Sequence, residues 1–160
     1  MSSPSNAKRP RNEPSVHDHK LNLKHVLDKE FEQHSLHEIL ALPVTALEGV
    51  GPVTAEHLGG LKVHTIGQLA VWRPFKLARA ICHLAEGEVT QYTKGTKANI
   101  DAGICKEARG KPFHELKNMP LHVVYGSAQW TDACLAALGL KTLKDLADWK
   151  LPLYAASIRE

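Results

Sequence analysis

The residues whose types and spacing most clearly suggest a binding site are two glycines, Gly49 and Gly51, which flank Val50 and precede Pro52. Because glycine tolerates positive φ, the pair allows a sharp backbone turn while the Val50 side chain enters a core. Pro52 suits the first turn of a helix, where its missing N–H costs nothing. The start of such a helix carries unpaired N–H groups and the positive end of the helix dipole, so the stretch predicts a site for an anion such as phosphate.

The same stretch has the spacing Leu-x-Gly-Val-Gly-x-x-x-Ala-x-x-Leu, from Leu47 to Leu58. This spacing resembles the helix-hairpin-helix family, and residues 61–70 are similar to the segment that often follows the motif in small helical domains. In that family the hairpin N–H groups bind a DNA phosphate without reading the base sequence. The resemblance therefore implies a phosphate contact made by four residues of this chain, Gly49, Val50, Gly51 and Thr54.

Basic residues that would assist phosphate binding lie in two places. Residues 62–79 contain four cations and no acid, namely Lys62, Arg73, Lys76 and Arg79. Near the N-terminus, Lys8, Arg9 and Arg11 form a short cluster that suits a nuclear-import signal or a phosphate contact. The alternatives are a solvated helix face for the first group and a solubilising tail for the second.

The distribution of charge limits the strength of any DNA binding. The formal net charge is +3, and the four cations and two acids of residues 1–20 supply +2 of it. Residues 21–83 are neutral, with six Lys or Arg against six Asp or Glu. Non-specific DNA binders gain affinity by releasing counterions from several phosphates, which requires a basic surface. We therefore expect weak and strongly salt-sensitive binding, helped by the tail.

The sequence contains no motif typical of catalysis, such as a nucleophile elbow, a Walker loop or a dinucleotide fingerprint. None of the ten histidines belongs to a set with zinc-ligand spacing. The cysteines Cys82, Cys105 and Cys134 fall in apolar helical patterns that favour buried thiols, and their odd number argues against a disulfide framework. We expect no enzymatic activity, no cofactor and no metal, in a protein of the nucleus or cytoplasm.

A repeat organises the sequence. Residues 21–83 align without a gap on residues 98–160, and 16 of the 63 paired positions are identical, among them Trp72 with Trp149. Matched positions favour a core role for these two tryptophans. Trp130 lies opposite Val53 and is a candidate anchor for a partner or for the other copy.

The second copy departs from the glycine pattern. Gly126 is retained, Ser127 stands opposite Val50, and Asp132 lies near the expected phosphate site. We expect a similar backbone path with poor anion binding there, and the alternative is a purely structural copy that packs against the first.

Short helices are expected to position these residues. Helical spacing of apolar residues predicts one buried face formed by Leu23, Val26, Leu27 and Phe31. Capping boxes begin at Ser35 and Thr65 and, in weaker form, at Thr142, and a last helix of the first copy is expected from about Phe75. No alternating pattern indicates strands, and no apolar run approaches the roughly 18 residues needed to span a bilayer.

The sequence therefore predicts an all-α protein with a disordered basic tail at 1–20, a helix-hairpin-helix-like unit at 21–83, a linker at 84–97 and a degenerate unit at 98–160. Two functions stay open. One is a nucleic-acid-binding module that contacts DNA backbone phosphates without sequence specificity. The other is a helical interaction or scaffold protein with structural hairpins and a protein partner. Neither involves a membrane.

Overall fold

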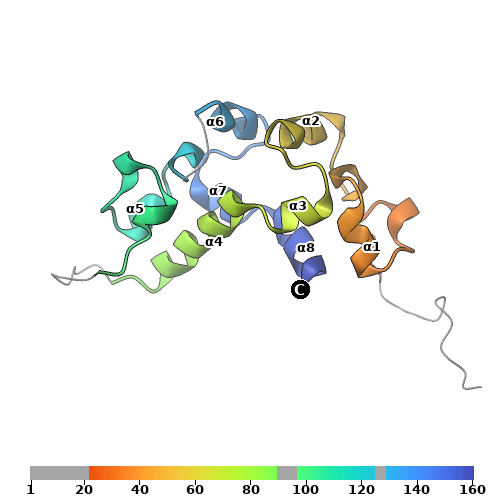
Figure 1. Cartoon of the computed structure of the whole chain (residues 1–160), viewed down its shortest axis with the longest axis horizontal. Coiled ribbons are helices and arrows are strands. Elements are labelled where there is room, and N and C mark those ends of the chain that lie inside the picture. The colour runs from red at the N-terminus through yellow and green to blue at the C-terminus, as the bar shows by residue number, and fades with distance from the viewer. Residues whose placement is uncertain (1–21, 90–96, 125–128) are drawn as a thin grey trace, which may run out of the picture.

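The computed structural model describes residues 22–89, 97–124 and 129–160 (Figure 1). The predicted tail with Lys8, Arg9 and Arg11, and residues Gly126 and Ser127 of the second copy, lie outside the described residues. The α-helices are α1 (Leu36–Ala41), α2 (Pro52–Gly60), α3 (Ile66–Ala70), α4 (Arg73–Glu86), α5 (Phe113–Leu116), α6 (Gln129–Ala136), α7 (Leu143–Ala147) and α8 (Lys150–Arg159). Short 3₁₀ helices are η2 (Lys29–Phe31), η3 (Val44–Ala46), η4 (Asp101–Gly103), η5 (Lys106–Ala108) and η6 (Leu121–Val123).

The all-α prediction is confirmed for the described ranges, where extended backbone pairs only in isolated bridges. None of the helices in these ranges has both the length and the apolar character needed to cross a membrane.

The helix starts follow local sequence signals. At Ser35 the hydroxyl accepts the N–H of Glu38 at 3.2 Å, and the Glu38 carboxylate accepts the Ser35 N–H at 2.8 Å. Reciprocal pairs of the same kind open α3 at Thr65 and α7 at Thr142. All three predicted capping boxes are thus confirmed, because each needs only residues within one turn.

The expected helix from Leu23 to Phe31 is wrong in its conformation, but its four apolar residues do pack in or against one hydrophobic core. The segment makes a turn and the short helix η2, while backbone bonds run instead from the Asp28 N–H to the Ala46 carbonyl and from the Glu48 N–H to the Val26 carbonyl. One bond of the helical type remains, from the Leu27 N–H to the Leu23 carbonyl at 2.8 Å. Leu27 is nevertheless completely buried.

Corresponding elements of the first half (residues 22–89) and the second half (residues 97–160) begin 77 residues apart. This spacing holds for α2 and α6, for α3 and α7, and for α4 and α8. It also holds for the bridges, since Pro43 pairs with Thr65 and Pro120 pairs with Thr142.

The last helix of each half packs on the other half. Helix α4 contacts α7 and α5, whereas α8 contacts α3 and α1 (Figure 1). As a result, Phe75, Ala78 and Ile81 of α4 are buried in a core made otherwise of second-half residues, here called the second core. Ala155 of α8 is buried in the first core, made otherwise of first-half residues. Each half therefore completes the core of the other.

Trp72 and Trp149 lie where the exchanged helices begin, as the N-cap residues of α4 and α8. Both are half-buried and pack against both cores. Helix α4 runs to Glu86, past the boundary that the sequence suggests at His83. The tryptophans are thus the side chains that connect the two cores.

Candidate nucleic-acid interface

The turn before α2 has the expected conformation at one of its two glycines. Gly49 has a φ of +83°, in the left-handed region that favours glycine, whereas Gly51 has a φ of −79° and a ψ of 176°, which any residue adopts. The expectation of positive φ is therefore right for Gly49 and wrong for Gly51. Between them, Val50 is only 7% exposed and packs in the first core, and Pro52 is the first residue of α2. The buried valine holds the turn against the body of the protein.

Gly51 is the N-cap of α2 and supplies no side-chain acceptor for the first N–H groups of the helix. An ideal Cβ placed on Gly49 or Gly51 would meet no atom within 4 Å, so the turn faces open space. The N–H groups of Val53 and Thr54, the second and third residues of the helix, donate to no capping side chain. This arrangement allows an oxyanion to approach the backbone at the positive end of the helix dipole.

Lys62 lies at the opposite end of α2 from the turn. The nine residues of α2 correspond to roughly 13 Å along the helix axis. The Lys62 side chain is exposed, and its backbone has a φ of +61°, in the left-handed region. At the matching position the second half has Gly139, with a φ of +79°. A lysine thus occupies a conformation for which the other half uses glycine.

Replacing Lys62 by glycine is expected to raise the free energy of unfolding by about 0.5–1 kcal/mol. The left-handed conformation costs a non-glycine residue about 1–2 kcal/mol, and the greater freedom of glycine in the unfolded chain offsets about 0.4–1 kcal/mol. Urea unfolding followed by circular dichroism measures the change. The reverse variant, Gly139→Lys, is the matched control and should lower stability by a similar amount; a loss of stability in Lys62→Gly would contradict the argument.

The remaining predicted cations lie on α4. This helix leads away from α2 and packs on α7 and α5 (Figure 1). Lys76 is exposed, and the guanidinium carbon of Arg79 lies 5.5 Å from the centroid of the buried Phe75 ring, a cation–π arrangement. Hence the residues Gly49, Val50, Gly51, Thr54 and Lys62 belong to α2 and its ends, whereas Arg73, Lys76 and Arg79 belong to a helix docked on the other half.

In the second half, the side chain of Asp132 is engaged by a histidine that sequence reasoning did not single out. The Asp132 carboxylate accepts the backbone N–H of His122 at 2.7 Å and contacts the Nδ1 atom of the same residue at 2.5 Å. The two residues lie on either side of residues 125–128 in the chain. No local pattern marks this pairing, because it depends on how α6 lies against η6.

Two apolar side chains are exposed at matching places. Val53 is 65% exposed and Trp130 is 52% exposed. Each is the second residue of its helix, α2 or α6, and these helices lie along the same edge in Figure 1. The predicted partner-anchoring residue Trp130 is thus on the surface, in contrast to Trp72 and Trp149.

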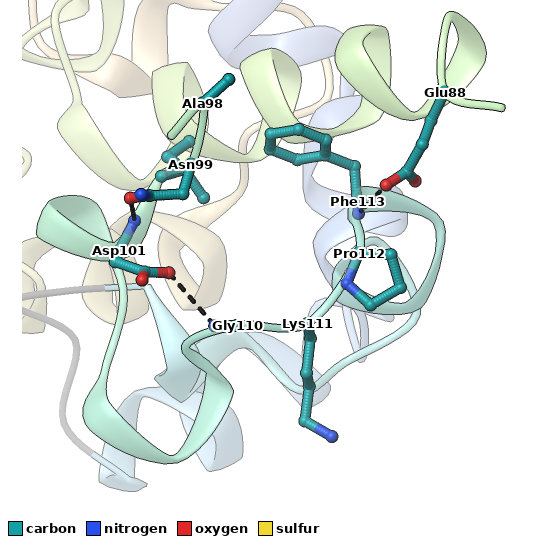
Figure 2. A pocket seen from close by; sticks show the side chains of 9 residues that line it. Glu88, Ala98, Asn99, Asp101, Gly110, Lys111, Pro112 and Phe113 are labelled. Atoms are coloured by element: carbon teal, nitrogen blue, oxygen red, sulfur yellow. Dashed lines mark hydrogen bonds between the residues drawn. The ribbon is translucent and has the colours of Figure 1, made fainter. Parts of the chain in front are cut away.

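A shallow cavity of about 320 Å³ lies at the end of α4, with Glu88, Asn99, Asp101 and Phe113 among its lining residues (Figure 2). Its carboxylates already have backbone donors. Glu88 accepts the N–H groups of Phe113 at 3.1 Å and His114 at 2.9 Å, and Asp101 accepts the N–H of Gly110 at 3.2 Å. Because the N-cap of α5 is Pro112, which offers no side-chain cap, Glu88 takes over that role from a position two residues after the end of α4.

Glu88 shows the electrostatic result of this capping. Its partial burial opposes ionisation, but the hydrogen bonds from His114 and Phe113 outweigh burial and lower the pKa of the Glu88 carboxyl. The two carboxylates that line this cavity are therefore already hydrogen-bonded within the protein.

The described residues contain no group of three His, Cys, Asp or Glu side chains able to hold a metal ion. The three cysteines are partly buried and unpaired, and burial raises the pKa of the Cys82 thiol. Comparisons of the chain with protein-family models, with curated proteins and with solved structures find no match.

Proposed function

We propose that this protein is a non-enzymatic nucleic-acid-binding module that contacts DNA backbone phosphates without sequence specificity. The contact is made by the N–H groups at the start of α2, within a nuclear or cytoplasmic protein. One observation carries this proposal: the turn at Gly49 to Gly51 is open to solvent and leaves the first N–H groups of α2 without a side-chain cap. The side chain of Val50, buried in the first core, holds this turn in place. Such a site accepts any phosphate and reads no base.

Electrostatics make the proposed binding weak. Glu48 and Glu56 are exposed on either side of the turn in the chain, and Lys62 is the cation nearest to α2 in sequence. Duplex DNA carries a negative charge about every 1.7 Å of its axis, so the two ends of α2 would meet different phosphates of one duplex. The Lys62 ammonium would then add to the backbone contact, and the tail cluster of Lys8, Arg9 and Arg11 would add non-specific attraction.

We further infer that the two halves are copies of one helix-hairpin-helix-like unit, of which the second is degenerate. The common spacing of elements and bridges supports this view. It implies that phosphate contact belongs to the first half, because the second has Ser127 and Gln129 in the places of Val50 and Pro52.

The sharpest test is Gly51→Asp. An aspartate at the N-cap would bond to the N–H of Thr54 and place a negative charge where the phosphate should bind, so DNA affinity should fall by at least about tenfold. The fold should be unaffected or gain a few tenths of a kcal/mol, because the φ of Gly51 suits any residue. Fluorescence anisotropy with two unrelated duplexes, at about 50 and about 200 mM salt, measures the affinity and its salt dependence.

The matched control is Gln33→Glu, which makes the same change of charge at an exposed residue outside α2. Its affinity should stay within about twofold of the wild type, since a single exposed charge outside the binding site is largely screened. Absence of wild-type binding at low salt contradicts the proposal. So does binding that survives Gly51→Asp and disappears when residues 1–20 are removed.

A second candidate function, a helical protein-interaction module, is favoured by the exposed side chains of Val53 and Trp130, each the second residue of its helix. Tryptophan is enriched among the residues that dominate binding at protein–protein interfaces, so Trp130 is the stronger of the two indications. Failure of the wild-type protein to bind DNA at low salt would favour this function over the first.

A further inference from the structure

His122 lies between two carboxylates that come from different elements. Its Nε2 atom is 2.8 Å from Oε1 of Glu107 in η5, and its Nδ1 atom contacts Oδ2 of Asp132 in α6 at 2.5 Å. Its backbone N–H also donates to the other oxygen of Asp132 at 2.7 Å. One residue of η6 therefore connects three elements, and its side chain is only 23% exposed.

The chemistry of imidazole makes this cluster dependent on protonation. A neutral imidazole carries a single N–H and can donate to one carboxylate, whereas the imidazolium ion donates to both. In agreement, the hydrogen bond to Asp132 raises the pKa of His122, burial opposes the rise, and the bond to Glu107 adds to it. The pKa of Glu107 is lowered, chiefly by its bond with His122 and also by its contact with Cys105.

The cluster belongs to the second half alone. The residues 77 positions earlier are Glu30, Thr45 and Ala55, which cannot form it. In the first half, α2 is held by the buried Val50 and begins with Pro52. The corresponding residues of the second half are Ser127 and Gln129, so its sequence lacks both the apolar side chain and the proline.

We propose that His122, in its imidazolium form, is a proton-dependent latch that fixes α6 against η5 and η6, where the first half uses an apolar side chain. The groups that face the imidazole are Asp132 from α6 and Glu107 from η5. Deprotonation removes one donor, leaves a ring nitrogen opposite a carboxylate oxygen, and changes the net charge of the three side chains from −1 to −2. The latch does not depend on the proposed function, because it concerns the stability of α6.

The direction of the pH effect follows from linkage. A histidine whose pKa is higher in the folded than in the unfolded state stabilises the fold fully below the unfolded value of about 6.5. This contribution is lost as pH rises through the folded-state pKa. The latch is thus closed near pH 6 and open in alkaline solution.

Thermal unfolding of the full chain and of His122→Gln tests the latch. At about pH 6 the variant should melt about 4 °C below the wild type, and at about pH 9 the difference should shrink to about 1 °C. His25→Gln, at an exposed histidine of the first half, should show the same small difference at both pH values. A deficit of equal size at both pH values in His122→Gln would show a structural role only and overturn the proposal.

Two further measurements keep the test decisive if His122→Gln folds poorly. Glu107→Gln leaves the contact between His122 and Asp132 in place. Its melting temperature should also fall below that of the wild type more at about pH 6 than at about pH 9, but by less than that of His122→Gln. In the wild type, the NMR titration of the His122 imidazole should have a midpoint above the ordinary value of about 6.5. The backbone amides of residues 129–136 should exchange faster, relative to the intrinsic rate, above that midpoint. A titration midpoint at or below the ordinary value would refute the latch. So would amide exchange in residues 129–136 that does not change, relative to the intrinsic rate, as pH passes the midpoint.

Discussion

Truncation of the chain after Trp149 is expected to unfold residues 22–70 of the first half and to leave the second half folded with α4 docked on it. Helix α8 supplies Ala155 to the first core, and Leu151 and Ile158 pack against the same core. Without this helix, α3 and α1 lose the partner that covers them. The second core keeps its three buried residues from α4, Phe75, Ala78 and Ile81, and loses only the partly buried Leu153.

The expected loss is of the order of the whole stability of a small domain, roughly 5 kcal/mol or more for the first half. Native-state hydrogen exchange measures it by location. Amides of α2 and α3, such as those of Leu58 and Leu69, should lose protection, while amides of Leu135 and Leu146 should keep theirs. A peptide covering residues 148–160, added in trans, should restore protection, and the same peptide with Ala155→Asp should not. Protection of Leu58 and Leu69 in the truncated chain would show that the first half completes its own core.

The second large effect is expected from Phe75→Ala, at about 3–5 kcal/mol of lost stability. Phe75 is 1% exposed and belongs by sequence to the first half, but its ring is buried in the second core. Removing it leaves a cavity beside α7 and α5, which the surrounding side chains fill only in part. The global loss is measured by urea unfolding.

The helices that lose protection from hydrogen exchange show whether Phe75 stabilises the second core or simply the protein as a whole. In Phe75→Ala, subglobal exchange should become faster in α5 and α7 before it does so in α2 and α3. The matched variant is Leu69→Ala, in the neighbouring helix α3, where the side chain is fully buried in the first core. Its exchange should follow the reverse order. Identical patterns in the two variants would mean that both cores unfold only together and that the exchange of helices does not divide stability between them.

The candidate site was predictable to the extent that it is local. The left-handed Gly49, the buried Val50 and the helix start at Pro52 all follow from four consecutive residues. The cations were less predictable. Lys62 is fixed by the end of α2, but the position of Lys76 and Arg79 depends on which surface α4 covers, and that surface belongs to the other half. The order of charges along the sequence carries no information about this choice.

The all-α class, the three capping boxes and the glycine turn were all predictable from the sequence, because each results from interactions between residues no more than one or two helical turns apart. The exchange of α4 and α8, the backbone bonds from Val26 and Asp28 to residues 46–48, and the His122 cluster arise from contacts between distant segments and were not predictable from local patterns. Helical periodicity says that a face will be buried but does not say against which partner, and several apolar surfaces of one chain can satisfy it. The partner is selected by packing and by hydrogen bonds between segments far apart in the sequence.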